Sequence, residues 1–365
     1  MTTPVRHRFH SLCPYFAMFP ESFVQRWIDQ VTKPGDLVAD PFSGRGTTAF
    51  TALLADRRAV ACDINPVAYV LSSAKTNAPS QRKVLARLDE LEARQHEAGE
   101  PALPEHNDDF FQLAFASPTL AQLLHLRASL DVHGSDTDCM IAALVLGALH
   151  GETSSPRYLS NQMPRTISTK PGYSVRYWQD RGLQAPDRDV FAVLRAATTF
   201  RYASLRPRRR ATVLLEDMRE LPRRVPARQA QLVITSPPYL DTTSFEEDQW
   251  LRLWFLGGPP RPTKGQVSRD DRLTGRDAYW LLIAELWRTL GHVVAPDGHV
   301  VIRIAGRGLS GPDLVNGLVG TSPLSGRQAV LRTTETSAIV RRQTDAFRPG
   351  STGLREEVDC HFQLR

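Results

Sequence analysis

Two apolar segments that read as strands each run into a loop and then a helix, and this order limits what the chain can fold into. Residues 36–39 form the first strand, followed by a glycine-bearing loop, a helix over 47–55, a second strand over 58–62 and a helix over 65–74. A strand–helix–strand sequence of this length predicts parallel strands with a right-handed crossover. The alternation resumes in strands over 211–215, 232–235 and 299–304, so we expect one doubly wound, mostly parallel α/β sheet.

A long segment interrupts this alternation after residue 78. It predicts helices over 81–97, 118–129, 138–150 and 189–201, with a proline-bearing linker over 100–107. Residues 151–187 are polar, aromatic and basic with several glycines and prolines, so we expect them to stay outside the core. The predicted domains are 1–78 (first part of the sheet domain), 79–204 (helical insertion) and 205–365 (second part of the sheet domain).

The second part of the sheet domain contains further predicted elements. Helices are expected over 245–255 and 277–293, and Pro296-Asp297-Gly298 is predicted as a turn into the strand over 299–304. Closing strands are expected over 330–341 and 358–364, joined by a turn at 347–350. Phe245, Trp250, Trp254 and Phe255 lie at helical spacing, which favours core packing over stacking on a ligand.

Composition restricts the class of protein. The 365 residues are 41% hydrophobic and 23% charged, which is typical of a globular protein with a substantial core. No apolar run has the length of a membrane span and the N-terminus lacks a signal-peptide pattern, so a cytoplasmic location is expected. The four cysteines are widely spaced, which disfavours a zinc site or disulfide scaffold. The net charge of +6 is arginine-rich, which fits either nucleic-acid binding or a GC-rich genome.

The loop Asp40-Pro41-Phe42-Ser43-Gly44-Arg45-Gly46-Thr47-Thr48 follows the first strand, at the sheet edge where parallel sheets bind ligands. Its two glycines permit a tight turn, and the next helix N-terminus offers free N–H groups. It lacks the third glycine of a dinucleotide loop and the lysine of a P-loop, so neither NAD nor ATP is favoured. Asp63 and Asp217 end later strands, where a helix N-cap is the simple role of each. Together they fit the ribose and adenine amine of S-adenosylmethionine.

The segment Thr235-Ser236-Pro237-Pro238-Tyr239 follows an apolar strand. Proline lacks a backbone N–H and restricts the residue before it, so the strand must stop at Ser236. What remains is a stiff turn that presents a hydroxyl, free carbonyls and an aromatic ring. The turn is either a plain strand exit or a device that holds a flat, amino-bearing ring.

These two motifs together resemble the amino-methyltransferases of DNA, which use S-adenosylmethionine to methylate cytosine N4 or adenine N6. The D-P-F-x-G-x-G-T loop is similar to the first cofactor motif of that family, and S-P-P-Y is similar to its catalytic motif in the cytosine-N4 form. The resemblance covers about residues 1–78 and 205–310, and implies a Rossmann-like methyltransferase sheet. Family members often carry the catalytic motif first, whereas here the cofactor loop precedes it.

The resemblance implies roles for individual residues. The segment over 10–21 looks like the one that packs beside the methionine portion of the cofactor. The expected cofactor contacts are Tyr15, Phe19, Pro20, Asp40, Pro41, Phe42, Ser43, Gly44, Gly46, Thr47, Thr48, Asp63, Ile64, Asn65, Asp217 and Met218. The expected catalytic residues are Ser236, Pro237, Pro238 and Tyr239. No metal is expected.

The implied reaction is methylation of a cytosine N4 amine in double-stranded DNA. Ser236 and the Pro237 carbonyl would accept the hydrogens of the amine, and Tyr239 would stack on a base that has flipped out of the duplex. Target recognition is expected in residues 158–178 and in the arginine cluster 206–210. The expected DNA contacts are Arg165, Lys170, Tyr173, Arg176, Trp178, Arg208 and Arg209.

Other interpretations stay open at this point. An adenine-N6 methyltransferase, an RNA methyltransferase acting on guanine N2 of tRNA, and an inactive nucleic-acid-binding protein on the same fold are the alternatives. The resemblance also raises a restriction–modification system with a cognate restriction endonuclease. The sequence identifies neither that partner, the recognised site nor the oligomeric state.

Overall fold

The computed structural model describes residues 7–15, 19–98, 109–162, 166–241, 244–267, 275–338, 354 and 356–365. The chain forms two compact units. The sheet unit comprises Met18–Ser72, Pro207–Ser244 and Gly265–Arg365, and the helical unit comprises Met1–Ala17, Ser73–Arg206 and Phe245–Lys264. Residues 245–264, which sequence analysis groups with the sheet, therefore fold with the helices.

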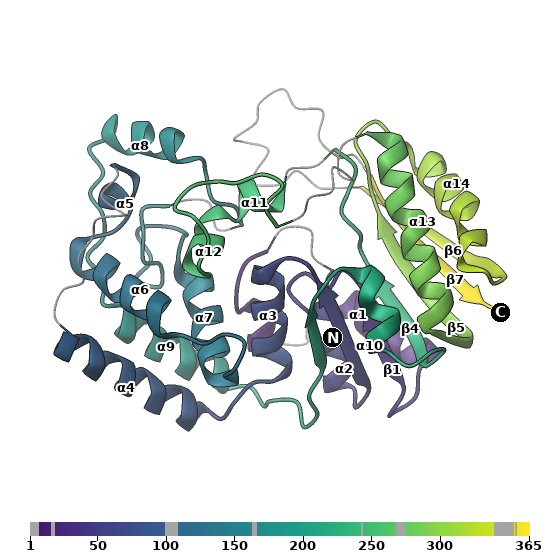
Figure 1. The fold of residues 1–365 in the computed structure, drawn as a ribbon, viewed down its shortest axis with the longest axis horizontal. Helices are drawn as coiled ribbons and strands as arrows, with labels where there is room; N and C mark the ends of the chain where they lie inside the picture. The colour runs from purple at the N-terminus through teal and green to yellow at the C-terminus, as the bar shows by residue number, and fades with distance from the viewer. Residues whose placement is uncertain are drawn as a thin grey trace, which may run out of the picture. The chain divides into compact units, whose positions relative to one another are not determined.

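The sheet unit is built on seven strands in the order β3-β2-β1-β4-β5-β7-β6 (Figure 1). The strands are β1 Leu37–Asp40, β2 Arg58–Asp63, β3 Thr212–Leu215, β4 Ala230–Thr235, β5 Val294–Ile304, β6 Ala329–Ala338 and β7 Glu356–Leu364. Strands β1 to β5 pair in parallel, and β7 is antiparallel to both β5 and β6. The fold is therefore the doubly wound, mostly parallel α/β sheet that the sequence predicts.

Helices cover both faces of this sheet, which explains why β1 is buried along its whole length. Leu37 and Ala39 enter the core beneath α13 (Arg276–Val293) and α14 (Gly311–Thr321), together with residues of η2 (Met218–Glu220) and α10 (Leu221–Arg224). Val38 points the other way, into a core shared with α1 (Glu21–Val31) and α2 (Thr47–Leu54). This period-2 alternation places each apolar side chain of β1 in one core or the other.

The helical unit is held by aromatic packing. Phe110 and Phe111 lie 4.8 Å from the rings of Trp250 and Trp254 respectively, centroid to centroid. Ser135 and Asp189 cap the N-termini of two of its helices by accepting backbone N–H groups. Its elements are η1 Arg8–Ser11, α4 Gln81–Ala98, α5 Asp109–Ala114, α6 Ser117–Ser129, α7 Asp136–Ala148, α8 Pro171–Gln179, α9 Val190–Tyr202, α11 Phe245–Asp248 and α12 Trp250–Phe255.

The remaining elements are α3 Pro66–Thr76, which passes from one unit to the other along the chain, and η3 Ser322–Ser325 of the sheet unit. Among the described residues, no helix combines the length and the apolar character that crossing a bilayer requires.

Several sequence expectations need correction. The helix expected over 245–255 is two helices, because the backbone of Gln249 leaves the helical region between α11 and α12. The turn expected at Pro296-Asp297-Gly298 is a bulge inside β5, with Asp297 at φ 57°. Residues 151–187, expected outside the core, include α8 and contribute the buried Leu159 and Trp178. Core packing of Trp250, Trp254 and Phe255 is confirmed.

The other predicted helices and strands are found within a few residues of their expected ends. The exceptions fall on residues that the structure does not describe: the linker expected over 100–107, the turn over 347–350 and the end of the strand over 330–341.

Candidate active site

The glycine loop leaves β1 and turns back into α2 within six residues. Gly44 and Gly46 both have positive φ, 49° and 70°, a conformation in which glycine avoids the steric cost of a side chain. Ser43 N donates to the Cys62 carbonyl at 3.0 Å, and Gly46 N donates to the Ser43 carbonyl at 2.7 Å. The loop is thus anchored to β2, and the N-cap residue of α2 is Gly46, which has no side chain to cap the first N–H groups of the helix.

Gly46 is also required by close packing against α3. A Cβ atom at this position would lie 2.5 Å from Ser72 Oγ and 2.9 Å from Ser72 Cα. Ser72 Oγ in turn donates to the Gly44 carbonyl at 3.1 Å. The second glycine of the motif therefore allows α3 to support the loop from behind.

Asp63 stands at the end of β2 and holds the loop through its carboxylate. Oδ2 accepts the Gly44 N–H at 2.8 Å, and Oδ1 accepts the Asn65 N–H at 2.9 Å. Burial raises the pKa of Asp63 to about 6, although these backbone bonds oppose the shift. Each carboxylate oxygen retains a further lone pair, so the group can still accept ligand hydroxyls.

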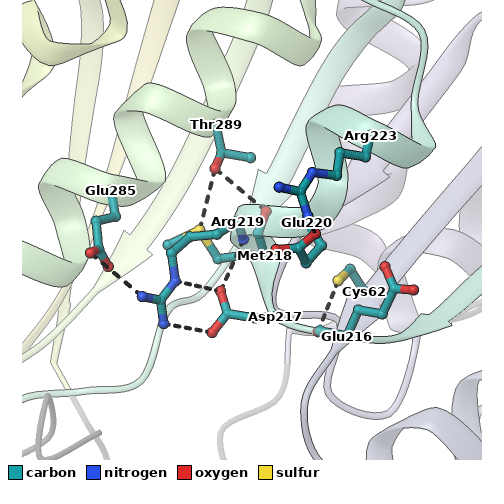
Figure 2. A network of polar contacts seen from close by, with 9 residues as sticks. All are labelled: Cys62, Glu216, Asp217, Met218, Arg219, Glu220, Arg223, Glu285 and Thr289. Carbon is teal, nitrogen blue, oxygen red and sulfur yellow. Dashed lines mark hydrogen bonds and ion pairs between the residues drawn. The ribbon is translucent and has the colours of Figure 1, made fainter.

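Asp217 follows β3, and its carboxylate binds Arg219, two residues further along the chain (Figure 2). Its carboxylate forms a two-pronged ion pair with the Arg219 guanidinium, both bonds 2.9 Å long, and also accepts the Arg219 backbone N–H. Arg219 reaches on toward Glu285 of α13, at 3.7 Å. The helix N-cap role considered for Asp217 is therefore present, and the adenine contact stays a prediction.

Asp40 connects the cofactor loop to the catalytic motif. It is 2% exposed at the end of β1, and Thr235 at the end of the neighbouring β4 donates its hydroxyl to Asp40 Oδ1 at 2.8 Å. The same oxygen accepts the Phe42 N–H at 3.2 Å. Burial raises the pKa of Asp40 to about 7, partly opposed by hydrogen bonds from Thr48 and Thr235.

The catalytic motif begins where expected, because β4 ends at Thr235, directly before Ser236. Ser236 Oγ donates to Tyr239 Oη at 3.4 Å, and Tyr239 Oη donates to Glu357 Oε1 of β7 at 3.1 Å. Tyr239 is 4% exposed, which leaves little ring surface for stacking on a base. Pro237 is buried and Pro238 is half-buried.

The other expected cofactor residues differ in how deeply they are buried. Phe19 stacks on Phe23 at 5.2 Å, and Pro20 is the exposed cap of α1. Thr47, Thr48 and Asn65 are buried beside the loop, and Met218 is buried where its carbonyl accepts the Thr289 hydroxyl. Pro41 is buried, whereas Phe42 and Ile64 are half-buried. Tyr15 is half-buried and belongs to the helical unit.

The expected DNA contacts divide between the two units. In the helical unit, Tyr173 and Arg176 are exposed on α8, and Lys170 pairs with Glu247 at 3.3 Å. Trp178 is 2% exposed, with its ring 5.4 Å from that of Phe110, so it packs in the core and is unavailable to DNA. In the sheet unit, Arg208 is exposed and Arg209 pairs with Asp56 at 2.9 Å. Arg165 lies outside the described residues.

Sequence reasoning missed three residues of this site: Thr235 as the partner of Asp40, Glu357 as the partner of Tyr239, and Arg303 beside Glu357. Thr235 could have been suspected, because it ends a strand directly before the S-P-P-Y turn. No local pattern marks the other two.

Residues 4–73 match the family model described as DNA methylase. Over 52 residues the chain is 42% identical to the Type II methyltransferase M.Cfr9I of Citrobacter freundii, which is 14% of this chain and 17% of that protein. The chain thus spans about a sixth of the length of the curated relative it matches.

Solved structures show weaker likeness. An rRNA methylase from Streptococcus thermophilus is 8% identical with a TM-score of 0.33, covering 96% of this chain and 99% of that one. A geranyl diphosphate methyltransferase in complex with SAM is 8% identical with a TM-score of 0.35, covering 94% and 85%. At this level of identity neither likeness bears on the substrate.

S-adenosylmethionine is the cofactor that the DNA-methylase segment implies, and the residues present fit it. Ser43 Oγ is buried at the loop with no hydrogen-bond partner among the described residues, as expected of an atom that faces a polar ligand. Gly44 carries no side chain and is only half-buried, which leaves the backbone there approachable, and Asp63 can accept ribose hydroxyls.

Proposed function

We propose that this chain is an S-adenosylmethionine-dependent DNA methyltransferase that methylates the exocyclic N4 amine of a flipped-out cytosine. One observation carries the proposal. The Thr235–Asp40 hydrogen bond joins the residue before Ser236 to the start of the cofactor loop, so the catalytic turn and the loop share one edge of the sheet. The DNA-methylase match over 4–73 supports the same activity.

The chemistry required is the activation of a poor nucleophile. The lone pair of a cytosine amine is delocalised into the ring, and two acceptors that hold its hydrogens favour a pyramidal nitrogen with a localised lone pair. Ser236 Oγ and the Pro237 carbonyl are the proposed acceptors, because the two prolines hold the turn rigid. Their contribution would be positioning and electrostatic stabilisation.

The cofactor would be held by the loop and by the acid after β2. The N-terminal end of α2 and the loop amides would bind the carboxylate of its amino-acid portion, Ser43 Oγ would bind a polar group there, and Asp63 would accept the ribose hydroxyls. When bound, S-adenosylmethionine supplies an electrophilic methyl group.

The choice of cytosine over adenine rests on Ser236, where a hydroxyl stands in place of the aspartate that more often marks adenine methylation. Mass spectrometry of nucleosides after incubation with DNA or with tRNA tests this choice. N4-methylcytosine is the expected product. N6-methyladenine would correct the base, and N2-methylguanine in tRNA would correct the substrate. Double-stranded DNA as the substrate, a cognate restriction endonuclease as a partner and a cytoplasmic location all stay predictions.

Replacing Ser236 by alanine should lower methyl transfer by at least about 100-fold, because one of two acceptors for the amine is lost. Cofactor affinity, measured by calorimetry, should be unchanged, because Asp63 and the glycine loop are intact. Ser337→Ala on the exposed strand β6 is the matched control. Near-full activity of S236A with intact cofactor binding would contradict the assignment.

The proposed DNA surface centres on α8. Tyr173 is 46% exposed and stacks on Tyr177 at 6.2 Å, and the Arg181 guanidinium lies 3.9 Å from the centre of the Tyr177 ring. These three residues recur every fourth position, so their side chains form one row along the helix direction. The exposed Arg176 directly precedes Tyr177 in the sequence. A basic, aromatic surface of this kind suits phosphate contacts and base stacking.

Replacing Arg176 by alanine should weaken DNA binding by about 3- to 10-fold and reduce the slope of log affinity against log salt by about 1, because one phosphate contact is removed. Fluorescence anisotropy over a salt series measures both. Gln179→Ala, an exposed neutral position on the same helix, should change neither. An unchanged slope in R176A would move the DNA surface away from α8.

A further inference from the structure

A partly buried chain of polar groups leads from Ser236, the proposed acceptor, to a carboxylate on β7. Ser236 Oγ donates to Tyr239 Oη at 3.4 Å, and Tyr239 Oη donates to Glu357 Oε1 at 3.1 Å. Nη1 of Arg303, on β5, lies 3.6 Å from Glu357 Oε2. All four residues belong to the sheet unit, so their arrangement follows from the pairing of β5 with β7 and the exit of β4.

Arg303 is itself fixed from two sides. Its Nε and Nη2 donate to the two oxygens of Asp359 at 2.7 and 2.8 Å, a fork geometry that sets the plane of the guanidinium. Its Cζ lies 4.4 Å from the centre of the Phe23 ring and 5.2 Å from that of Phe19. The positive charge beside Glu357 is therefore held in place.

The hydrogen bond between Tyr239 and Glu357 gives this chain one direction, because Tyr239 donates its hydrogen and the Glu357 carboxylate oxygen accepts it. The Tyr239 oxygen then accepts from Ser236. A serine hydroxyl has one hydrogen to give and two lone pairs, so Ser236 Oγ is left with lone pairs for an incoming donor. Burial raises the pKa of Tyr239, which keeps this link protonated at neutral pH.

The direction matters because a base amine with a delocalised lone pair offers only hydrogens. If the chain ran the other way, the Ser236 hydrogen would point at the amine and repel it. Whether Ser236 can accept a hydrogen bond from the amine therefore depends on Glu357 as well as on the serine itself.

We propose that Glu357, fixed by Arg303, is a positioning residue of the methyl transfer: it orients Tyr239 and Ser236 so that Ser236 accepts an amine hydrogen, and it receives the proton that the product must lose. This inference rests on the proposed function. The amine lone pair forms the N–C bond while the donor's S–C bond breaks and leaves its electrons on sulfur. The nitrogen then carries one proton too many. That proton passes to Ser236 Oγ as the Ser236 proton moves to Tyr239 and the Tyr239 proton moves to Glu357.

The test compares Glu357→Gln and Tyr239→Phe with a matched control, Glu356→Gln, at the neighbouring exposed position on β7. In the first two variants, kcat for DNA methylation should fall about 10- to 100-fold, while cofactor affinity and the KM for DNA change less than about 3-fold. Glu356→Gln should keep the wild-type kcat.

Each outcome decides the matter. Wild-type kcat in E357Q overturns the inference, and so does a loss of kcat in E357Q and Y239F that comes with equal loss of cofactor binding. If the wild-type protein methylates neither DNA nor RNA, the proposed function fails and the inference fails with it. If the wild type methylates DNA and E357Q does so with the wild-type kcat, the function stands and the inference alone is wrong.

Discussion

Alanine at Gly46 should abolish cofactor binding and lower the free energy of unfolding by about 2–5 kcal/mol. Two costs add at this position. The residue has φ 70°, in the left-handed region, where a Cβ atom costs roughly 1–2 kcal/mol. The new Cβ would also lie 2.9 Å from Ser72 Cα, a backbone atom of α3, so the helix or the loop must move. Because the loop amides are the proposed cofactor contacts, movement there removes binding as well as stability.

Gly35 provides the matched control for this prediction. It also has positive φ, 86°, but a Cβ there would meet nothing within 4 Å. Gly35→Ala therefore carries the backbone cost without the collision, and should lose about 1–2 kcal/mol and keep cofactor affinity. Denaturant unfolding and calorimetry measure the two effects. Equal behaviour of G46A and G35A would show that close packing against Ser72 is unimportant.

The elements that position the site could be predicted because local chemistry dictates them. The prolines after Ser236 forbid further strand pairing, and β4 ends at Thr235 as expected. The glycine loop ends β1 and begins α2 for a similar reason, since Gly46 adopts the left-handed conformation directly before the helix. Alternating strands and helices then imply adjacent parallel strands, and this brings the two motifs to one edge even though they lie far apart in sequence.

The residues that could not be predicted depend on long-range pairing. Glu357 reaches Tyr239 only because β7 inserts antiparallel between β5 and β6, and nothing near residue 357 distinguishes it from the exposed Glu356. The expectation that Trp178 contacts DNA was wrong for a different reason. Its aromatic, basic neighbours suggested a nucleic-acid surface, but Ser174 and Trp178 are four residues apart and form the buried face of α8. That short helix begins at Pro171. A proline in a polar segment suggests a loop, but it is also common in the first turn of a helix.

The second large effect concerns Asp40 and the dependence of stability on pH. Burial raises the pKa of Asp40 from 3.8 to about 7, which means that the fold favours the protonated carboxyl. A raised pKa adds stability that is fully present below the unfolded value and is lost as pH rises through the folded value. The free energy of unfolding should therefore decrease between about pH 4 and pH 7, by on the order of a few kcal/mol from this group.

Replacing Asp40 by asparagine should remove most of that slope. An asparagine carbonyl can still accept from the Thr235 hydroxyl and the Phe42 N–H, so the geometry is kept while the titrating group is lost. D40N should consequently gain stability relative to the wild type at pH 8 and gain little at pH 4. Denaturant unfolding at a series of pH values measures this difference, with the exposed Asp29→Asn on α1 as the control that keeps the wild-type slope.

Asp63 should leave some pH dependence in the unfolding free energy of D40N. Its pKa is also raised by burial, to about 6, so it contributes a smaller loss of stability in the same direction between about pH 4 and pH 6. A D40N profile that keeps only this lower part would separate the two carboxyls. If D40N instead lost stability at every pH by the same amount, the hydrogen bonds of Asp40 would matter more than its charge. In that case the link between the cofactor loop and the catalytic turn would be a geometric one that does not titrate.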